Sequence, residues 1–207
     1  MIEGIEQIKN IIFDFGGVII NIDYNQSVSE FRKIGLADFW QIHPYAEQTG
    51  LFDKLEKGII SAAFFRDELR KFIPSVVSDI ELDRAWNAML LDIPPDRIRL
   101  LERLKTQYRT FLLSNTNAIH YDYYTTNLQK EYNYRDFSML FGKDYFSHKI
   151  GMRKPEPEIF ELVINENGLS RKETLFIDDM SQNVEGAKKA GLLTYLLPPH
   201  QSITSLF

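Results

Sequence analysis

The apolar run Ile11–Ile20 constrains the fold of this chain more than any other stretch, because it contains a single carboxylate, Asp14. An apolar run of this length predicts a strand that is buried on both faces, as in a parallel sheet. Gly16 and Gly17 follow and allow the backbone to turn sharply and to approach a ligand closely. In open α/β sheets ligands bind beyond the carboxyl ends of the strands, so Asp14 lies where a carboxylate can do chemistry. Taken alone, this stretch fits equally well a strand-end aspartate that only caps a turn.

Short apolar strands alternate with helical segments in the second half of the chain. The predicted strands are 110–113, 174–177 and 192–197. The predicted helices are 98–104, 158–167 and 184–190, and one that runs through His120 and Tyr124 toward Lys130. This alternation predicts an α/β fold with a doubly wound parallel sheet and right-handed crossovers. A loop or a short strand is expected between Met139 and Ser147.

Residues 26–92 differ, because they have helical periodicity and no convincing strand. Helices are expected at 27–34, at 37–42 with a stop at Pro44, near 51–58, from Ser61 to Pro74, and after Ser78. We interpret this stretch as an all-helical cap inserted into the α/β fold. Residues 1–22 and 93–207 are therefore assigned to a core domain and residues 23–92 to a cap domain.

Composition excludes several classes of function. The 207 residues carry a net charge of −5, which argues against a nucleic-acid partner. The absence of cysteine excludes disulfides and thiolate chemistry and is compatible with a cytoplasmic location. The acidic start Met1–Glu6 does not look like a signal peptide, and no apolar run is long enough to span a membrane. The oligomeric state stays open.

Three predicted strands end in polar residues, namely Asp14, Ser114-Asn115 and Asp178-Asp179. In a parallel sheet these ends lie along one edge. The carboxylates are oxygen ligands suited to Mg²⁺, and a cluster of like charges favours a bound cation. Ser114 and the backbone amides that follow it can bind phosphate oxygens. Lys154 precedes a predicted helix and can neutralise an anion, although an exposed loop lysine is the simpler interpretation of Lys154 alone.

In order and spacing, the four pieces Asp14–Val18, Ser114–Thr116, Lys154-Pro155 and Asp178-Asp179 resemble the haloacid dehalogenase superfamily, and the helical insertion resembles its type 1 cap. The resemblance extends to Leu197. The longer pieces Leu113–Asn117, Gly151–Glu156 and Asp178–Ala187 look closest to a bacterial branch that contains an α-glucose-1-phosphate phosphatase.

The resemblance implies a Mg²⁺-dependent phosphatase that acts on a small phosphorylated metabolite, with a sugar phosphate favoured. Asp14 would attack phosphorus and form an aspartyl-phosphate, and Lys154 would be the second catalytic residue. The implied phosphate-binding residues are Ser114, Asn115, Gly16 and Lys154. The implied metal ligands are Asp14, the backbone carbonyl of Gly16, Asp179, and Asp178, which lies nearby or binds the ion directly.

One position departs from the pattern of the superfamily's phosphatases. They carry a second aspartate two residues after the nucleophile as general acid and base, and this chain has Gly16 there. Asp23, His120 or a cap residue can supply the proton instead, although Asp23 also reads as a helix N-cap and His120 as a packed residue. The departure keeps two alternatives open: a metal-independent 2-haloacid dehalogenase, and a non-catalytic relative that binds a phosphorylated ligand or a partner protein.

The charged segment Phe52–Gly58 interrupts an apolar pattern in the cap. It is interpreted either as a substrate loop or as a solvated helix end. The four histidines, His43, His120, His148 and His200, show no spacing typical of metal ligands.

Overall fold

A five-stranded parallel sheet forms the centre of the protein, as the computed structural model describes it for residues 5–36, 39 and 42–207. The strands are β1 (Asn10–Phe13), β2 (Arg109–Ser114), β3 (Lys143–Phe146), β4 (Thr174–Asp178) and β5 (Leu193–Leu196). Their order across the sheet is β3-β2-β1-β4-β5, and each neighbouring pair is parallel. The predicted fold class is confirmed, and β1, which carries Asp14 at its end, occupies the middle of the sheet.

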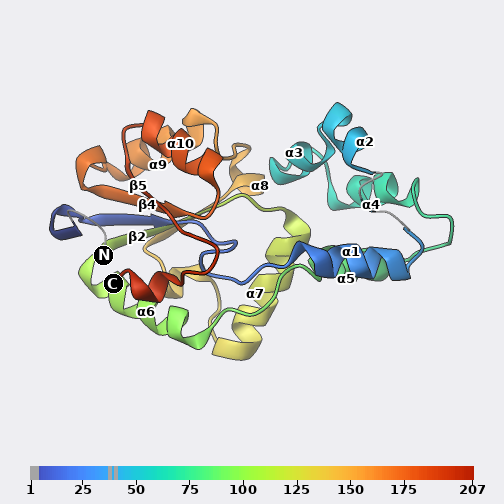
Figure 1. Ribbon diagram of the computed structural model, residues 1–207, viewed down its shortest axis with the longest axis horizontal. Helices are drawn as coiled ribbons and strands as arrows, with labels where there is room; N and C mark the ends of the chain where they lie inside the picture. Colours follow the sequence, from blue (N-terminus) through green and yellow to red (C-terminus); the bar gives the residue numbers. More distant parts are fainter. Residues whose placement is uncertain (1–4, 37–38, 40–41) are drawn as a thin grey trace.

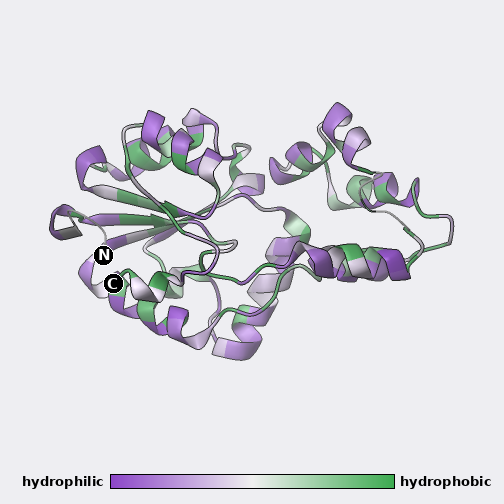
Figure 2. Cartoon of the chain, viewed as in Figure 1, coloured by the Kyte–Doolittle hydropathy of each residue, from purple (hydrophilic) through white to green (hydrophobic). Residues whose placement is uncertain are grey.

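Helices cover both faces of this sheet (Figure 1). On one face lie α6 (Pro95–Gln107) and α7 (Ala118–Tyr132), and on the other lie α9 (Pro157–Asn167) and α10 (Ser181–Lys189). Side chains of β1 alternate between two apolar clusters: Ile11 and Phe13 belong to the first, and Ile12 packs with Phe160 and its neighbours in the second. Figure 2 shows the strands in the green of apolar residues and the outer sides of the helices mostly in purple. Burial on both faces explains why β1 is apolar throughout.

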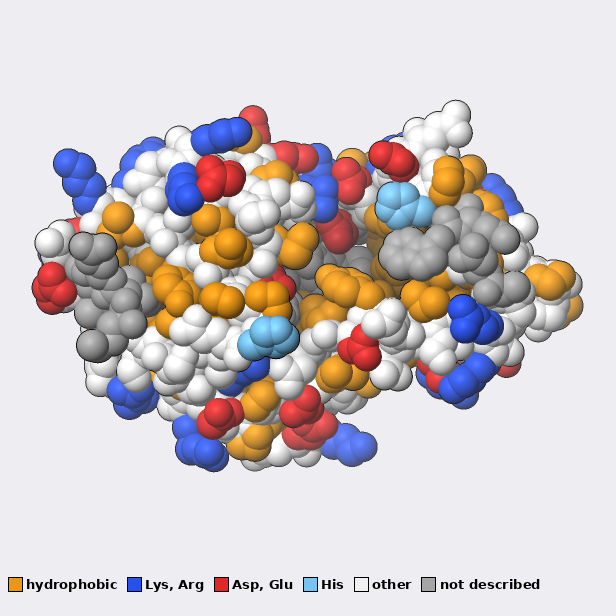
Figure 3. All heavy atoms as spheres, viewed as in Figure 1, with side chains coloured by type: hydrophobic (Ala, Val, Ile, Leu, Met, Phe, Trp, Pro, Cys, Tyr) orange, Lys and Arg blue, Asp and Glu red, His pale blue; other side chains and the backbone are white. Residues whose placement is uncertain are grey.

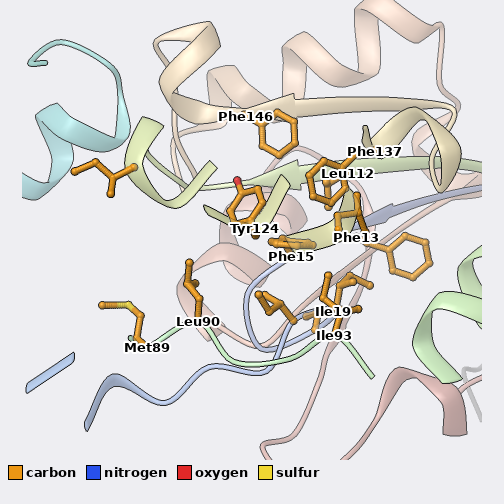
Figure 4. Close-up of a cluster of buried hydrophobic side chains, with 14 of the residues drawn as sticks. Phe13, Phe15, Ile19, Met89, Leu90, Ile93, Leu112, Tyr124, Phe137 and Phe146 are labelled. Carbon is orange, nitrogen blue, oxygen red and sulfur yellow. The ribbon is translucent and has the colours of Figure 1, made fainter. Parts of the chain in front are cut away.

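The loop after β1 is held by aromatic packing beneath it. The Phe15 ring lies 4.8 Å from the Tyr124 ring and 5.1 Å from the Phe137 ring, the latter on a 3₁₀ helix (Phe137–Met139). Phe146 packs against the same two rings, and Figure 4 shows Phe15, Tyr124, Phe137 and Phe146 in one cluster. Because Phe15 is buried, the neighbouring Asp14 has a fixed position at the sheet edge.

Residues 23–92 are called the cap segment, and their described part contains five α-helices: α1 (Tyr24–Lys33), α2 (Ile42–Thr49), α3 (Leu51–Glu56), α4 (Ala62–Arg70) and α5 (Asp79–Asn87). In Figure 1, α1 and α5 lie side by side and lead to α2, α3 and α4. The two chain segments that connect the cap segment to the rest of the protein are hydrogen-bonded to each other. The Asp23 amide donates to the Met89 carbonyl, and the Asn21 amide donates to the Asp92 carbonyl. We propose that the cap segment is a separate domain and that residues 1–22 and 93–207 form the core domain.

Serine side chains cap the starts of two cap helices. The Ser61 hydroxyl accepts from the Phe64 amide, and Ser78 and Glu81 form a reciprocal capping box at the start of α5. The prediction that Pro44 stops a helix is wrong, since Pro44 lies in the first turn of α2, where its missing N–H has no intrahelical partner to lose. Most of the helix predicted at 37–42 falls outside the described residues. The spacing of Ile80, Leu82, Trp86 and Met89 predicts one apolar side for the helix after Ser78, but Ile80 is exposed.

No helix in the described ranges is both long enough and apolar enough to cross a bilayer.

Candidate active site

Asp14, which follows β1, and Asp178, the last residue of β4, both contact Lys154, which lies in the loop before α9. Lys154 Nζ lies 2.6 Å from Asp14 Oδ1 and 2.7 Å from Asp178 Oδ2. All three side chains are buried, and only 1% of the surface of Lys154 is exposed. The simpler interpretation of Lys154 as an exposed loop lysine is therefore wrong. The lysine ammonium bridges two carboxylates that come from neighbouring strands, β1 and β4.

Burial and charge shift the protonation of this cluster. Burial, together with the charges of Asp178 and Asp179, raises the pKa of Asp14 to about 7, although Lys154 acts in the opposite direction. Burial acts to lower the pKa of Lys154, but the two carboxylates outweigh it and raise that pKa. Lys154 therefore stays protonated and keeps Asp14 oriented.

Asp178 is saturated with hydrogen bonds. Its Oδ1 accepts from the Met180 amide at 2.8 Å and from Asn183 Nδ2 at 3.1 Å. Its Oδ2 accepts from Asn183 Nδ2 at 3.0 Å and from Lys154 at 2.7 Å. A carboxylate offers about four lone-pair positions, so these contacts use its capacity. Of the two sequence-based roles for Asp178, this arrangement favours a residue that lies near a metal and orients Lys154.

Asp179 completes a group of three carboxylates. One oxygen from each of Asp14, Asp178 and Asp179 lies within 4.8 Å of the others. Repulsion by Asp178 adds to burial in raising the pKa of Asp179. Three carboxylates face the single ammonium of Lys154, and hard oxygen donors with excess negative charge fit a Mg²⁺ ion. Asp14 precedes the Gly16-Gly17 turn and the Asp179 carboxylate packs against Gly17, so these two carboxylates flank the turn.

Gly17 is required for the approach of Asp179. Its φ is +69°, and a Cβ atom there would lie 2.2 Å from Asp179 Oδ2. We expect Gly17→Ala to displace Asp179 and to lower Mg²⁺ affinity by about 10- to 100-fold, as loss of a supporting contact at a metal site typically does. Titration calorimetry with Mg²⁺ measures this. Gly168→Ala is the matched control, because Gly168 also has a positive φ, +59°, but a Cβ atom there would meet nothing within 4 Å. Equal Mg²⁺ affinity in the two variants would contradict the expectation.

The polar residues at the end of β2 hold the lysine loop. Asn115 Oδ1 accepts from the Lys154 amide at 2.9 Å, and Asn115 Nδ2 donates to the Lys154 carbonyl at 2.8 Å. The Thr116 amide donates to Ser147 Oγ at 2.8 Å, which ties β2 to the short helix α8 (Ser147–Ile150). Ser114 is buried at the strand end. The sequence-based phosphate roles of Ser114 and Asn115 stay predictions. The side-chain amide of Asn115 is already used to position Lys154.

A cavity of about 560 Å³ opens above this cluster. Asp14, Gly16, Asn115, Lys154 and Asp179 form part of its wall on the side of the sheet. Tyr24 and Glu56 of the cap segment form the opposite part. Figure 3 shows acidic and basic side chains, in red and blue, meeting on the surface where the two parts of the protein approach each other.

Two arginines in the cavity wall have no role in the sequence analysis. Arg97, in the first turn of α6, donates to the Ile19 carbonyl at 3.0 Å, and Arg153 pairs with Asp53 and Glu56 of α3. Neither follows a strand end or falls in a spacing that marks a ligand site, so only the position of Arg153 beside Lys154 offers a sequence signal. With Lys154 they place three cationic side chains in the wall, beside the carboxylates of Asp14, Asp179 and Glu56, so that the wall offers partners to an anionic group and to a metal ion.

Asp23 and His120, the two named candidates for a proton donor, lie outside the cavity wall. Asp23 is the N-cap of α1, and its hydrogen bonds from Gln26 and the Asn25 amide lower its pKa. His120 is buried, stacks on Trp86 with ring centroids 5.1 Å apart, and has Nε2 3.3 Å from the Trp86 carbonyl. The structural interpretations of both residues are therefore favoured.

The burial of His120 predicts a pH-dependent stability. Burial lowers its pKa from 6.5 to about 4, so the unfolded chain takes up this proton at a higher pH than the folded protein does. The contribution of neutral His120 to the free energy of unfolding is complete above pH 6.5 and is lost as the pH falls toward 4. At 1.36 kcal/mol per pKa unit, the free energy of unfolding should fall by about 3 kcal/mol across this range. Urea unfolding of the wild type and of His120→Gln measures this, because only the variant lacks the contribution. Parallel pH profiles for the two proteins would contradict the assignment.

The model of one family, haloacid dehalogenase-like hydrolase, matches residues 8–191 and therefore includes β1, the cap segment and the whole charged cluster. The chain belongs to this hydrolase family. A curated relative from Bacteroides thetaiotaomicron, named D-ribitol-5-phosphate phosphatase, is 35% identical over 188 residues, which cover 91% of each chain. The narrower resemblance to α-glucose-1-phosphate phosphatases stays a prediction, because this relative is named for another substrate.

Solved structures of family members agree with the fold over nearly the whole length. A haloacid dehalogenase family enzyme from Bacteroides thetaiotaomicron, crystallised with magnesium and inorganic phosphate, has a TM-score of 0.85 and 40% identity, covering 97% of this chain and 99% of its own. A predicted hydrolase from Porphyromonas gingivalis has a TM-score of 0.85 and 33% identity, covering 97% and 96%. An L-2-haloacid dehalogenase from Xanthobacter autotrophicus is only 18% identical, with a TM-score of 0.61, and shares the fold alone.

Proposed function

We propose that this protein is a Mg²⁺-dependent phosphatase that hydrolyses the phosphomonoester of a small polyhydroxylated metabolite, a sugar or sugar-alcohol phosphate. The observation that carries the proposal is the buried Asp14–Lys154–Asp178 bridge at the bottom of a cavity with three cationic side chains. A solvent-shielded carboxylate held by one ammonium is arranged to attack an anionic centre, since Lys154 offsets the repulsion between the two anions.

The proposed reaction has two steps. An Asp14 oxygen forms a bond to phosphorus while the bond from phosphorus to the alcohol oxygen breaks, which gives an aspartyl-phosphate and the free alcohol. Water then attacks phosphorus, inorganic phosphate leaves, and the Asp14 carboxylate is restored. Lys154 holds both the nucleophile and the transferring group, and Asp178 and Asn115 keep Lys154 in place through its ammonium and its backbone.

Asp14, Asp179 and the Gly16 carbonyl would hold the Mg²⁺ ion, with Asp178 close by. When bound, the ion supplies Lewis-acid stabilisation of the phosphate oxygens and offsets the negative charge of the site. The fit rests on the excess of carboxylate oxygens at the sheet edge and on the approach of Asp179 that Gly17 permits. Magnesium in a related enzyme's structure supports this assignment.

Two facts support a polyhydroxylated substrate. A cavity of about 560 Å³ has the size of a site for a small metabolite, and hydrogen-bonding side chains such as Asn21, Tyr24 and Gln201 lie in its wall beside the cations. The curated relative that covers 91% of this chain is named for a sugar-alcohol phosphate.

Phosphate release from a panel of phosphorylated metabolites, with Mg²⁺ or with a chelator, tests this function. The panel includes ribitol 5-phosphate, α-glucose 1-phosphate and p-nitrophenyl phosphate, and 2-chloropropionate is assayed for chloride release. We expect Mg²⁺-dependent phosphate release with a preference for a sugar or sugar-alcohol phosphate. Chloride release without Mg²⁺, or no phosphate release from any substrate by the folded protein, would overturn the proposal.

A further inference from the structure

We propose that Glu56, at the end of α3 in the cap segment, is the general acid that protonates the leaving alcohol and the general base that activates the hydrolytic water. The inference rests on the phosphatase function proposed above. It assigns to the cap a catalytic role that the core lacks.

The core has no carboxylate at the position of the missing acid. That position is Gly16, and a Cβ atom added to Gly16 would lie 2.7 Å from Ile22 Cδ1. Ile22 itself lines the cavity. The space next to Gly16 is therefore filled by hydrocarbon, and a proton donor has to reach the reacting oxygen from another wall.

Glu56 is the remaining carboxylate in the cavity wall. Among the described residues that line it, only Asp14, Asp179 and Glu56 carry carboxylates, and none is a histidine. Asp14 and Asp179 belong to the nucleophile and metal cluster. The Tyr24 hydroxyl in the wall also carries an ionisable proton. Burial and nearby carboxylates raise the pKa of Tyr24, so it gives up its proton less readily than Glu56 does.

Contacts between cap and core fix the position of Glu56. Arg153 Nε donates to Glu56 Oε2 at 2.8 Å, and Arg153 directly precedes Lys154. Lys57 and Glu156 form an ion pair with a distance of 2.5 Å beside it. At Gly58 the backbone meets α8 so closely that a Cβ atom would lie 2.3 Å from the His148 carbonyl oxygen. The end of α3 is thus anchored to the loop that carries Lys154.

The surroundings of Glu56 favour its protonated form more than water does. Burial raises its pKa and Asp53 of the same helix adds to this, while Arg153 and Lys154 act in the opposite direction. Tyr24 of α1 also faces this carboxylate. An entering phosphate dianion adds negative charge and raises the pKa further, which favours the protonated acid in the substrate complex.

The proton balance closes over one turnover. As the bond between phosphorus and the alcohol oxygen breaks, that oxygen takes the electron pair and then the proton of Glu56, and the alcohol leaves. When water attacks the aspartyl-phosphate, the Glu56 carboxylate accepts a proton from the water and returns to its starting form.

The test is the dependence of Glu56→Gln on the leaving group. Glutamine keeps an acceptor for Arg153 but has no proton to give. We expect kcat/KM to fall by about 10²- to 10⁴-fold for ribitol 5-phosphate, whose leaving group is a basic alkoxide. The loss should be smaller for phenyl phosphate and less than about tenfold for p-nitrophenyl phosphate, whose leaving group needs no acid. The variant should also release a burst of nitrophenol equal to the enzyme concentration, because hydrolysis of the aspartyl-phosphate loses its base.

Glu156→Gln is the matched control, since it removes the neighbouring ion pair between cap and core and leaves the cavity wall intact. Its loss of activity, if any, should be the same for all three substrates. If Glu56→Gln lowered kcat/KM equally for all three substrates, Glu56 would serve only to hold the cap in place, and the inference would be overturned. A loss confined to ribitol 5-phosphate, with both aryl phosphates unchanged, would assign Glu56 to hydroxyl binding and also overturn it. Failure of the wild type to release phosphate would instead contradict the phosphatase function.

Discussion

The substitution Asp14→Asn should lower phosphatase activity at least about 10⁴-fold. The amide cannot attack phosphorus, and loss of the carboxylate removes the route to the covalent intermediate. Asp14 is buried at the end of β1 and is 2.6 Å from Lys154. Phosphate release under saturating Mg²⁺ and substrate measures the loss.

The fold should survive this substitution. Lys154 keeps its 2.7 Å contact with Asp178, and one buried charge is removed from a group of three carboxylates. Thermal unfolding followed by circular dichroism checks this. A folded Asp14→Asn protein that retains more than about a hundredth of the wild-type rate would rule out Asp14 as the nucleophile.

Replacement of Lys154 by methionine should damage both stability and activity. Methionine has a similar length but no charge, so the buried Asp14 and Asp178 lose their shared cation. Breaking a buried ion pair from one side typically costs about 3–5 kcal/mol, and we expect the free energy of unfolding without Mg²⁺ to fall by this amount. Added Mg²⁺ should restore part of it, since the ion binds only the folded cluster. Activity should fall by about 10²- to 10³-fold, as for the loss of a donor to a transition-state oxyanion.

Lys188→Met provides the comparison for this result. Lys188 lies on the exposed side of α10 and pairs with Glu185 at 2.7 Å, with about half of its side-chain surface exposed. Exposed pairs of this kind contribute about 0–1 kcal/mol, so its unfolding curve should nearly match that of the wild type. Urea unfolding of both variants measures the difference, and similar curves would show that the Lys154 bridge does not stabilise the fold.

The sequence by itself determined the α/β class and the meeting of the strand ends. The apolar run of β1 requires burial on both faces. A parallel sheet aligns the carboxyl ends of its strands, so Asp14, Ser114 and Asp178 necessarily lie along one edge. Serine caps at Ser61 and Ser78 likewise predicted helix starts, because these signals act between residues that are three positions apart.

Only the tertiary structure decided which neighbours these residues have. Contacts between segments that are far apart in the chain bury Lys154 and fill the hydrogen-bonding capacity of Asp178. Such contacts also let the side-chain amide of Asn115 hold the lysine loop. The place of Glu56 in the same cavity wall as Asp14 depends on the packing of α3 against α8, and no local pattern encodes it. His120 was open as a proton donor for the same reason, because its burial and its contact with the Trp86 carbonyl follow from packing between segments that are far apart in the chain. Spacing along the chain sets local geometry, whereas solvent exposure and charge pairing are properties of the folded assembly of segments.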